Sequence, residues 1–266
     1  MIARWLIVVA FVAVWMLCGV VGDLSANAYL LLGVPLVVMF QLTVARRPLQ
    51  SMWLRAAPPF RLGARGIALA GLLAIAPVYG LAESLDEQRG VVTAIWYVCA
   101  IGGCAAVAYA WINRPRTALR PALIFAGLAL FCGLAIMAAG AVVTGRTPWI
   151  VVTRLPSFAL DFLLYLPVTF VLEEVVFRGA LDSYVGGTGI VGWHNTATAI
   201  GVAALWGLWH LPIMSGPLQL GVVVQLLAVH LPIGIFLAFS WRAGGTLLLP
   251  ALAHALIDAY RNSVLG

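Results

Sequence analysis

Long apolar segments, separated by short stretches that contain arginine, recur along the whole chain of 266 residues. About nine of these segments approach the ~20 residues that a helix needs to cross a bilayer. A transmembrane β-barrel would instead alternate apolar and polar residues in segments of about ten, and the sequence shows no such alternation. The pattern predicts an all-α fold, a polytopic transmembrane bundle of about eight or nine helices, with cores near 5–22, 28–45, 67–82, 91–112, 121–143, 158–177, 196–212, 219–239 and 246–262.

Composition excludes several other classes of protein. Charged residues make up 9% of the chain and hydrophobic residues 64%, whereas soluble domains carry about 25% charged residues. The net charge is +6, and every basic residue that contributes to it is an arginine. Because most of these arginines lie in loops at helix ends, where the positive-inside rule explains them, no nucleic-acid partner is expected. The four cysteines fall inside predicted helices without a CxxC pair, which predicts neither a disulfide framework nor a metal site.

Loop charge predicts the orientation in the membrane. Arginines gather between the second and third segments and between the fourth and fifth, whereas acidic residues gather between the third and fourth. Since positive loops remain in the cytoplasm, we expect an integral protein of a bacterial plasma membrane with a cytoplasmic N-terminus. Arg146 and Arg154 are exceptions, because they fall on the outer side. The loop residues concerned are Arg46, Arg47, Arg55, Arg61, Arg65, Arg114, Arg116 and Arg120, against Glu83, Asp86 and Glu87.

The first apolar segment has some features of a signal peptide. Arg4 precedes it, and Ala26-Asn27-Ala28 has the form of a cleavage site. Its apolar run of about 18 residues exceeds the usual 7–15 of a signal peptide. We therefore expect segment 5–22 to be retained as a helix.

Ionisable residues lie mostly in loops before residue 158 and inside predicted helices after it. Three helices of this last part carry EEVVFR (173–178), LWGLWH (205–210) and HALID (254–258). Charges within a membrane normally face a bundle interior or a wet cavity and mark function. Glu174 and Arg178 share a helix face at i,i+4, as do His254 and Asp258, while Glu173 points one residue further round. If these faces converge, one buried polar cavity contains all six groups, with His210 as the sixth.

The absence of certain motifs narrows the chemistry of such a cavity. The sequence contains neither HExxH nor G-x-S-x-G, so it predicts neither the usual zinc-protease helix nor a serine nucleophile. Carboxylates with histidines and no obvious nucleophile indicate an activated water, with or without a metal. His230 either lines the cavity or only bonds a backbone carbonyl.

These three motifs resemble the signature of the CPBP family of intramembrane proteases, also called the CAAX-protease and bacteriocin-processing (Abi) family. Its signature is EExxxR, FxxxH and HxxxN or HxxxD on successive helices, and FRGAL, HLP and GGTLLLPALAH flank the motifs similarly here. The resemblance covers residues 158–262 and implies a catalytic helical core there, with 1–157 as variable N-terminal helices. It implies an intramembrane endopeptidase of the glutamic type, often labelled a metalloendopeptidase and related to the Ras-converting CAAX endopeptidase.

The resemblance also implies roles for individual residues. Glu173 would be the general base that activates water, assisted by His210, while Glu174 and Arg178 would hold and tune the site. His254 and Asp258 would stabilise the oxyanion. Two positions depart from the usual pattern. Trp206 replaces the usual Phe, which we expect to change only packing, and Asp258 stands where many members have Asn. An ionised Asp258 would repel an oxyanion, so it is protonated, orients His254, or binds a metal.

Several alternatives remain open at this level. We expect no required cofactor, and the alternative is zinc held by Glu173, His210 and His254. The expected partners are the lipid bilayer and a peptide or membrane-protein substrate, cleaved near the cytoplasmic face; the sequence does not indicate an oligomeric state. A non-catalytic scaffold or immunity-type protein of the same fold is the first alternative function. A proton-coupled transporter is the second, although it predicts an internal repeat that the sequence does not show.

Overall fold

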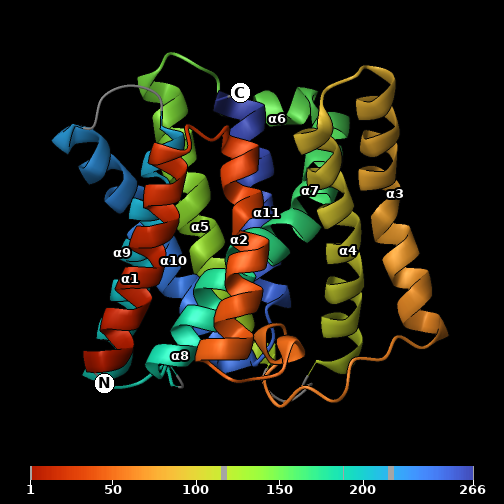
Figure 1. Ribbon diagram of the computed structural model, residues 1–266. Helices are drawn as coiled ribbons and strands as arrows, with labels where there is room; N and C mark the ends of the chain where they lie inside the picture. Colours follow the sequence, from red (N-terminus) through yellow and green to blue (C-terminus); the bar gives the residue numbers. More distant parts are fainter. Residues whose placement is uncertain (1, 115–118, 188, 215–218, 266) are drawn as a thin grey trace.

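The computed structural model describes residues 2–114, 119–187, 189–214 and 219–265. Every regular element in these ranges is a helix, which confirms the predicted all-α class (Figure 1). The first part of the chain forms α1 (Ile2–Val21), α2 (Ala26–Met39), η1 (Phe40–Val44), η2 (Leu49–Met52), α3 (Ala64–Asp86), α4 (Val91–Asn113) and α5 (Leu119–Val143). The second part forms α6 (Ile150–Thr153), α7 (Leu155–Thr169), η3 (Phe170–Asp182), α8 (Ser183–Val185), α9 (Trp193–Trp209), η4 (Leu211–Ile213), α10 (Leu220–Gly244) and α11 (Leu248–Leu265).

Eight continuous helical stretches of the described residues are long and apolar enough to cross a membrane. They correspond to the first eight predicted segments, and the ninth prediction corresponds to α11. That helix is not among the eight because His254, Asp258 and Arg261 make it more polar. It nevertheless packs against α5 and α7 inside the same bundle. The chain is therefore an integral membrane protein. Arg116, one of the arginines used to predict orientation, lies outside the described residues.

The helices after residue 155 form a compact group with α5. The closest packing joins α10 to α5 and α9, and α11 to α5 and α7, whereas α3 and α4 pair with each other at one side (Figure 1). The N-terminus and α8 lie at one end of the bundle and the C-terminus at the other (Figure 1). Successive long helices therefore alternate in direction between these two ends.

An aromatic cluster fixes the end of α9 against the first two helices. The indole N–H of Trp15 donates to the carbonyl of Tyr29 at 3.0 Å, and the Tyr29 hydroxyl donates to the carbonyl of Trp209 at 2.8 Å. All three side chains are buried, so the hydrogen bonds satisfy groups that would be costly to leave unpaired in an apolar interior. The N-terminal helices thus hold the residue that precedes His210.

Two glycines shape the backbone near the polar helices, one at a close contact between helices and one at a turn. A Cβ at Gly179 would lie 2.4 Å from the carbonyl oxygen of Met52, so only glycine lets η2 pack directly on η3. Gly245 ends α10 with a left-handed φ of 65°, a conformation that glycine adopts without strain. The resulting turn leads the chain directly into α11.

Candidate active site

The helix that carries both glutamates changes type within the bundle. α7 continues without a break into η3, which is a π-helix from Phe170 to Asp182. π-helical turns are rare and often occur at functional sites. Pro167, three residues before the change, has no backbone N–H and so removes one donor from the helical ladder. The sequence predicted a helix here but did not indicate its π form.

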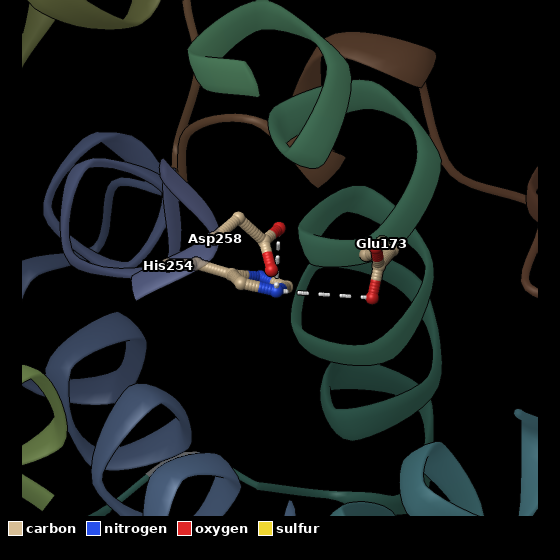
Figure 2. A group of neighbouring side chains, drawn as sticks. All are labelled: Glu173, His254 and Asp258. Carbon is tan, nitrogen blue, oxygen red and sulfur yellow. Dashed lines mark ion pairs between the residues drawn. The ribbon is translucent and has the colours of Figure 1, made fainter. Parts of the chain in front are cut away.

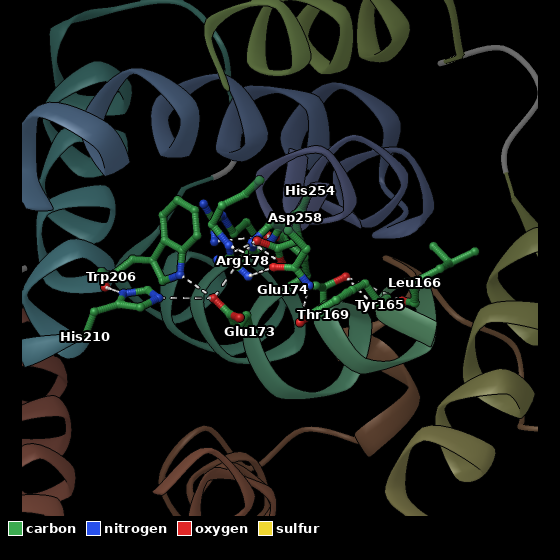
Figure 3. Close-up of polar contacts among 12 residues, drawn as sticks. Tyr165, Leu166, Thr169, Glu173, Glu174, Arg178, Trp206, His210, His254 and Asp258 are labelled. Atoms are coloured by element: carbon green, nitrogen blue, oxygen red, sulfur yellow. Dashed lines mark hydrogen bonds and ion pairs between the residues drawn. The ribbon is translucent and has the colours of Figure 1, made fainter. Parts of the chain in front are cut away.

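Glu174 lies inside the protein, at the centre of an ion-pair network. Its side chain is fully buried, and its Oε1 lies 3.2 Å from Nη1 of Arg178 and 2.8 Å from Nδ1 of His254 (Figure 3). The predicted i,i+4 contact between Glu174 and Arg178 is therefore confirmed. A buried carboxylate is tolerated only when it is paired in this way.

Arg178 is also buried, and it contacts the carboxylate of Glu174 and the ring of Trp206. None of its guanidinium nitrogens makes a hydrogen bond within the described residues. The guanidinium lies beside the Glu174 carboxylate and over the Trp206 ring, 4.3 Å from its centroid. A desolvated cation in this position is attracted by the negative face of the indole. Trp206 therefore stabilises the buried charge that supports Glu174.

Glu173 points away from this network, toward open space. Its Oε2 accepts the indole N–H of Trp206 at 2.8 Å. The same oxygen lies 3.8 Å from Nε2 of His210 and 3.9 Å from Nε2 of His254 (Figure 3). These last distances are too long for direct hydrogen bonds and suit groups bridged by one small molecule. The expectation that Trp206 changes only packing is thus incomplete, because its N–H also holds Glu173.

His210 and His230 lie on neighbouring helices, and the same kind of contact with a backbone carbonyl orients each ring. In each, Nδ1 contacts the backbone carbonyl four residues earlier, Trp206 at 2.9 Å and Leu226 at 2.7 Å. A carbonyl can only accept, so Nδ1 carries a proton and Nε2 of the neutral ring is an acceptor. The two rings lie 4.3 Å apart between centroids. His230 therefore lines the site as well as bonding a carbonyl, so the alternative in which it only bonds a carbonyl is wrong.

α9 and α10 pack tightly at a glycine. A Cβ at Gly207 would lie 3.1 Å from the Cβ of His230. The glycine of the WGLWH motif therefore lies directly against His230.

His254 and Asp258 face the cavity from α11. Nε2 of His254 lies 3.6 Å from Oδ2 of Asp258 (Figure 2). The other carboxylate oxygen, Oδ1, lies 2.9 Å from Nη1 of Arg261. Asp258 is therefore an ion-paired carboxylate beside the imidazole. Sequence reasoning missed Arg261, although the i,i+3 spacing from Asp258 could have indicated the pair.

A cavity of about 510 Å³ connects these groups. Glu173, His210, His230, His254 and Asp258 line it, together with apolar side chains from α5, α10 and α11. Glu174 and Arg178 are not among its lining residues. The structure thus brings all six predicted residues together, with four at the cavity wall and two behind it.

Three of these groups could hold a metal ion. Donor atoms of Glu173, His254 and Asp258 lie within 4.8 Å of one another (Figure 2). Two ligands about 2.1 Å from a tetrahedral zinc ion are roughly 3.4 Å apart, so small shifts would close the site. The donor set fits a divalent cation. This set contains Asp258, whereas the set predicted from the sequence contains His210 in its place.

A second buried ion pair follows the site along η3. Asp182 accepts hydrogen bonds from Nε and Nη2 of Arg242, and both side chains are fully buried. The pair joins the end of η3 to the end of α10. Sequence reasoning missed it, although an acidic residue in an apolar segment and a basic residue near the end of another were available signals.

Part of the chain matches a known protein family. The model described as type II CAAX prenyl endopeptidase Rce1-like matches residues 155–260. The comparisons with curated proteins and with solved structures found no match.

Proposed function

Through residues 155–260 the chain belongs to the Rce1-like family of type II CAAX prenyl endopeptidases, and on this premise we propose that it is an intramembrane endopeptidase using a glutamate-activated water. The match supports proteolysis in general. One observation supports the glutamate mechanism. Glu173 is the carboxylate of the adjacent pair that faces the cavity, with Nε2 atoms of two histidines 3.8 and 3.9 Å from the same oxygen.

Glu173 is the proposed general base. A water between its Oε2 and the two imidazoles donates a proton to the carboxylate as its oxygen attacks the peptide carbonyl carbon. The Trp206 N–H holds the carboxylate in position for this transfer. Nε2 of His210, fixed as an acceptor by its Nδ1 contact, receives the second hydrogen bond of the water. Both groups therefore orient the lone pair that attacks.

His254 is the proposed donor to the oxyanion of the tetrahedral intermediate. Its Nδ1–H is held by Glu174, and in the doubly protonated ring Nε2–H points into the cavity. Asp258 orients this imidazole rather than donating to the oxyanion, because its two oxygens face His254 and Arg261. Collapse of the intermediate breaks the C–N bond, and the proton held by Glu173 moves to the leaving amine.

The shape of the cavity bears on the substrate. Apart from the polar groups its wall is apolar, and the lining residues Gly140, Gln225, Arg261 and Leu265 lie near the helix ends away from the N-terminal end of the bundle. Met214, also in the wall, is exposed. We therefore propose an extended, largely apolar peptide or membrane-protein segment as substrate, entering from that end.

The predicted orientation determines on which side of the membrane the cavity opens. With the N-terminus in the cytoplasm, the cavity reaches the surface on the opposite side of the membrane. The sequence instead predicts cleavage near the cytoplasmic face. Labelling of a cysteine placed at Met214, from either side of sealed vesicles, distinguishes the two sides.

A metal-dependent mechanism is the second candidate for this site. Glu173, His254 and Asp258 would hold the ion. A bound divalent cation would polarise the peptide carbonyl and lower the pKa of water. In that case Glu174 keeps its role, because it fixes Nδ1 of His254 and so directs Nε2 toward the ion.

The proposal is tested by comparing peptides released in cells that carry the wild type, Glu173→Gln or Asp161→Asn. Asp161 is an acidic residue of α7 that does not line the cavity, so its variant controls for a lost charge in the same helix. We expect a set of cleavage products that disappears only with Glu173→Gln. Identical products in all three strains, with an unchanged cellular phenotype, would favour the non-catalytic scaffold.

A further inference from the structure

One imidazole in the wall of the 510 Å³ cavity has no part in the proposed hydrolysis. His230 belongs to α10 and lines the cavity, whereas the proposed steps use Glu173, His210 and His254. The helix that carries it, Leu220–Gly244, is one of the eight candidate membrane spans. An ionisable residue inside a span is costly and normally marks a functional site.

The ring of His230 is held in a fixed orientation. Its Nδ1 contacts the carbonyl of Leu226 at 2.7 Å, which leaves Nε2 of the neutral ring as a hydrogen-bond acceptor. The ring of Trp206 lies nearly perpendicular to it, 4.6 Å away between centroids, and the ring of His210 lies 4.3 Å away. A donor that binds Nε2 therefore finds the acceptor already in place, which lowers the entropy lost on binding.

Nε2 of His230 has no hydrogen-bond partner among the described residues. It is also not one of the polar atoms that the protein seals away from any partner. Since His230 lines the cavity, this nitrogen is open to a ligand there.

Most other polar groups of the wall are already engaged. The Trp206 N–H donates to Glu173, and Asp258 pairs with Arg261. Gln225 makes no hydrogen bond within the part of the chain that the structure describes, but it is exposed near the start of α10. His230 is therefore an unengaged acceptor beside the proposed reacting groups.

The proposed substrate carries donors that match this acceptor. An extended peptide in an apolar cavity brings backbone N–H groups, and leaving one of them unpaired is costly. The carbonyl oxygens of the peptide are acceptors and cannot pair with Nε2 of the neutral ring. A backbone N–H is therefore the part of the peptide that fits His230.

The neighbouring ring indicates which part of the substrate is concerned. Nε2 of His210 lies 3.8 Å from Oε2 of Glu173, the oxygen that receives the proton of the attacking water in the proposed mechanism. The rings of His210 and His230 are 4.3 Å apart, and one residue of extended chain spans about 3.5 Å. The matching N–H therefore lies close to the scissile bond.

We propose that His230 is a substrate-binding residue, whose Nε2 accepts a hydrogen bond from a backbone N–H of the substrate within about two residues of the scissile bond. This role rests on the proposed function, since it takes a peptide to be the ligand of the cavity. The contact aligns the extended chain beside Glu173 and adds no step to the hydrolysis. Because the donor belongs to the backbone, the contact forms whatever the side chains of the substrate are.

The experiment measures peptide binding to the full chain in detergent, in a Glu173→Gln background that slows consumption of the ligand. The probe is the tightest-binding apolar peptide of a random library, with a series of analogues in which one backbone amide at a time is replaced by an ester. Each ester removes a single N–H. His230→Phe keeps a ring next to His210 but has no acceptor, whereas His230→Gln returns an acceptor. His194→Phe is the matched control, because His194 is exposed and does not line the cavity.

We expect one ester analogue to bind about two- to tenfold more weakly than the parent peptide, the range for one neutral hydrogen bond. With His230→Phe the parent peptide should bind more weakly by a similar factor, and the preference for the amide at that position should disappear. His230→Gln should restore this preference, and His194→Phe should retain it.

An unchanged preference for the amide in His230→Phe would overturn the role of His230, because the ring would then act through packing alone. If that variant does not fold, His230→Leu is compared in the same way. Cleavage by the wild type tests the proposed function separately. Cleavage without the position-specific effect would overturn the role of His230 alone, and the effect without cleavage would overturn the hydrolysis alone. A library without any binding peptide would overturn the role of His230 together with the proposed substrate.

Discussion

Nδ1 of His254 lies 2.8 Å from Oε1 of Glu174, and both side chains are buried. This contact joins α11 to η3 across 80 residues of sequence. It fixes the ring of His254 so that Nε2 faces Glu173 and Asp258. The second glutamate of the EE pair thus positions the histidine of the third motif, while the first faces the cavity.

Glu174→Gln should destabilise the protein strongly. The substitution leaves the buried guanidinium of Arg178 without its counter-charge and weakens the contact with His254. Loss of one partner of a buried ion pair costs about 3–5 kcal/mol. Unfolding by denaturant in detergent measures this change. Glu83→Gln is the control, because Glu83 pairs with Arg89 on the surface at 3.5 Å and exposed ion pairs contribute little to stability. Equal effects of the two substitutions would contradict the network described for Glu174.

Trp206→Phe should lower turnover and also cost some stability. Phenylalanine keeps a ring beneath Arg178 but removes the N–H that holds Glu173. A hydrogen bond to a charged group contributes about 1.5–3 kcal/mol, so we expect kcat to fall about tenfold or more. Steady-state kinetics and unfolding of the same variant measure both quantities. An unchanged kcat would show that Trp206 acts through packing alone.

Arg261→Gln should reduce activity through Asp258, and a second substitution should restore part of it. Without Arg261, whose Nη1 lies 2.9 Å from Oδ1 of Asp258, the Asp258 carboxylate is left unneutralised beside the site of the oxyanion. Asp258→Asn removes that charge, so we expect the double variant to be more active than Arg261→Gln alone. A double-mutant cycle on kcat/KM measures this coupling. Additive losses would mean that the two residues act independently.

Features of the fold that depend on residues close together in the sequence were predictable. Segments of about 20 apolar residues define spans because the bilayer fixes their length, and the single-residue step between Glu173 and Glu174 sends their side chains in different directions. The i,i+4 contact of Glu174 with Arg178 follows from the same local geometry.

Features that depend on tertiary packing were not predictable from the sequence. No local pattern in the sequence marks the π form of η3. The Trp206 N–H reaches Glu173 only because α9 lies beside η3. The pair of Asp182 with Arg242 spans 60 residues.

Chelation tests whether a metal participates. For a glutamate-activated water, dialysis against a chelator should leave cleavage unchanged, and elemental analysis should find no stoichiometric zinc. If cleavage is lost and zinc restores it, the ion held by Glu173, His254 and Asp258 is required. Asp258→Asn should then lower the zinc content of the purified protein, because it removes one of the three ligands.

The most direct test of the proposed mechanism is cleavage of a peptide library by purified protein in ¹⁸O-labelled water, with products identified by mass spectrometry. The account predicts new C-termini that contain one solvent oxygen for the wild type and for Asp161→Asn. Glu173→Gln should cleave about 10²–10⁴-fold more slowly, the usual contribution of a general base. Equal cleavage by Glu173→Gln and the wild type would contradict the role of Glu173.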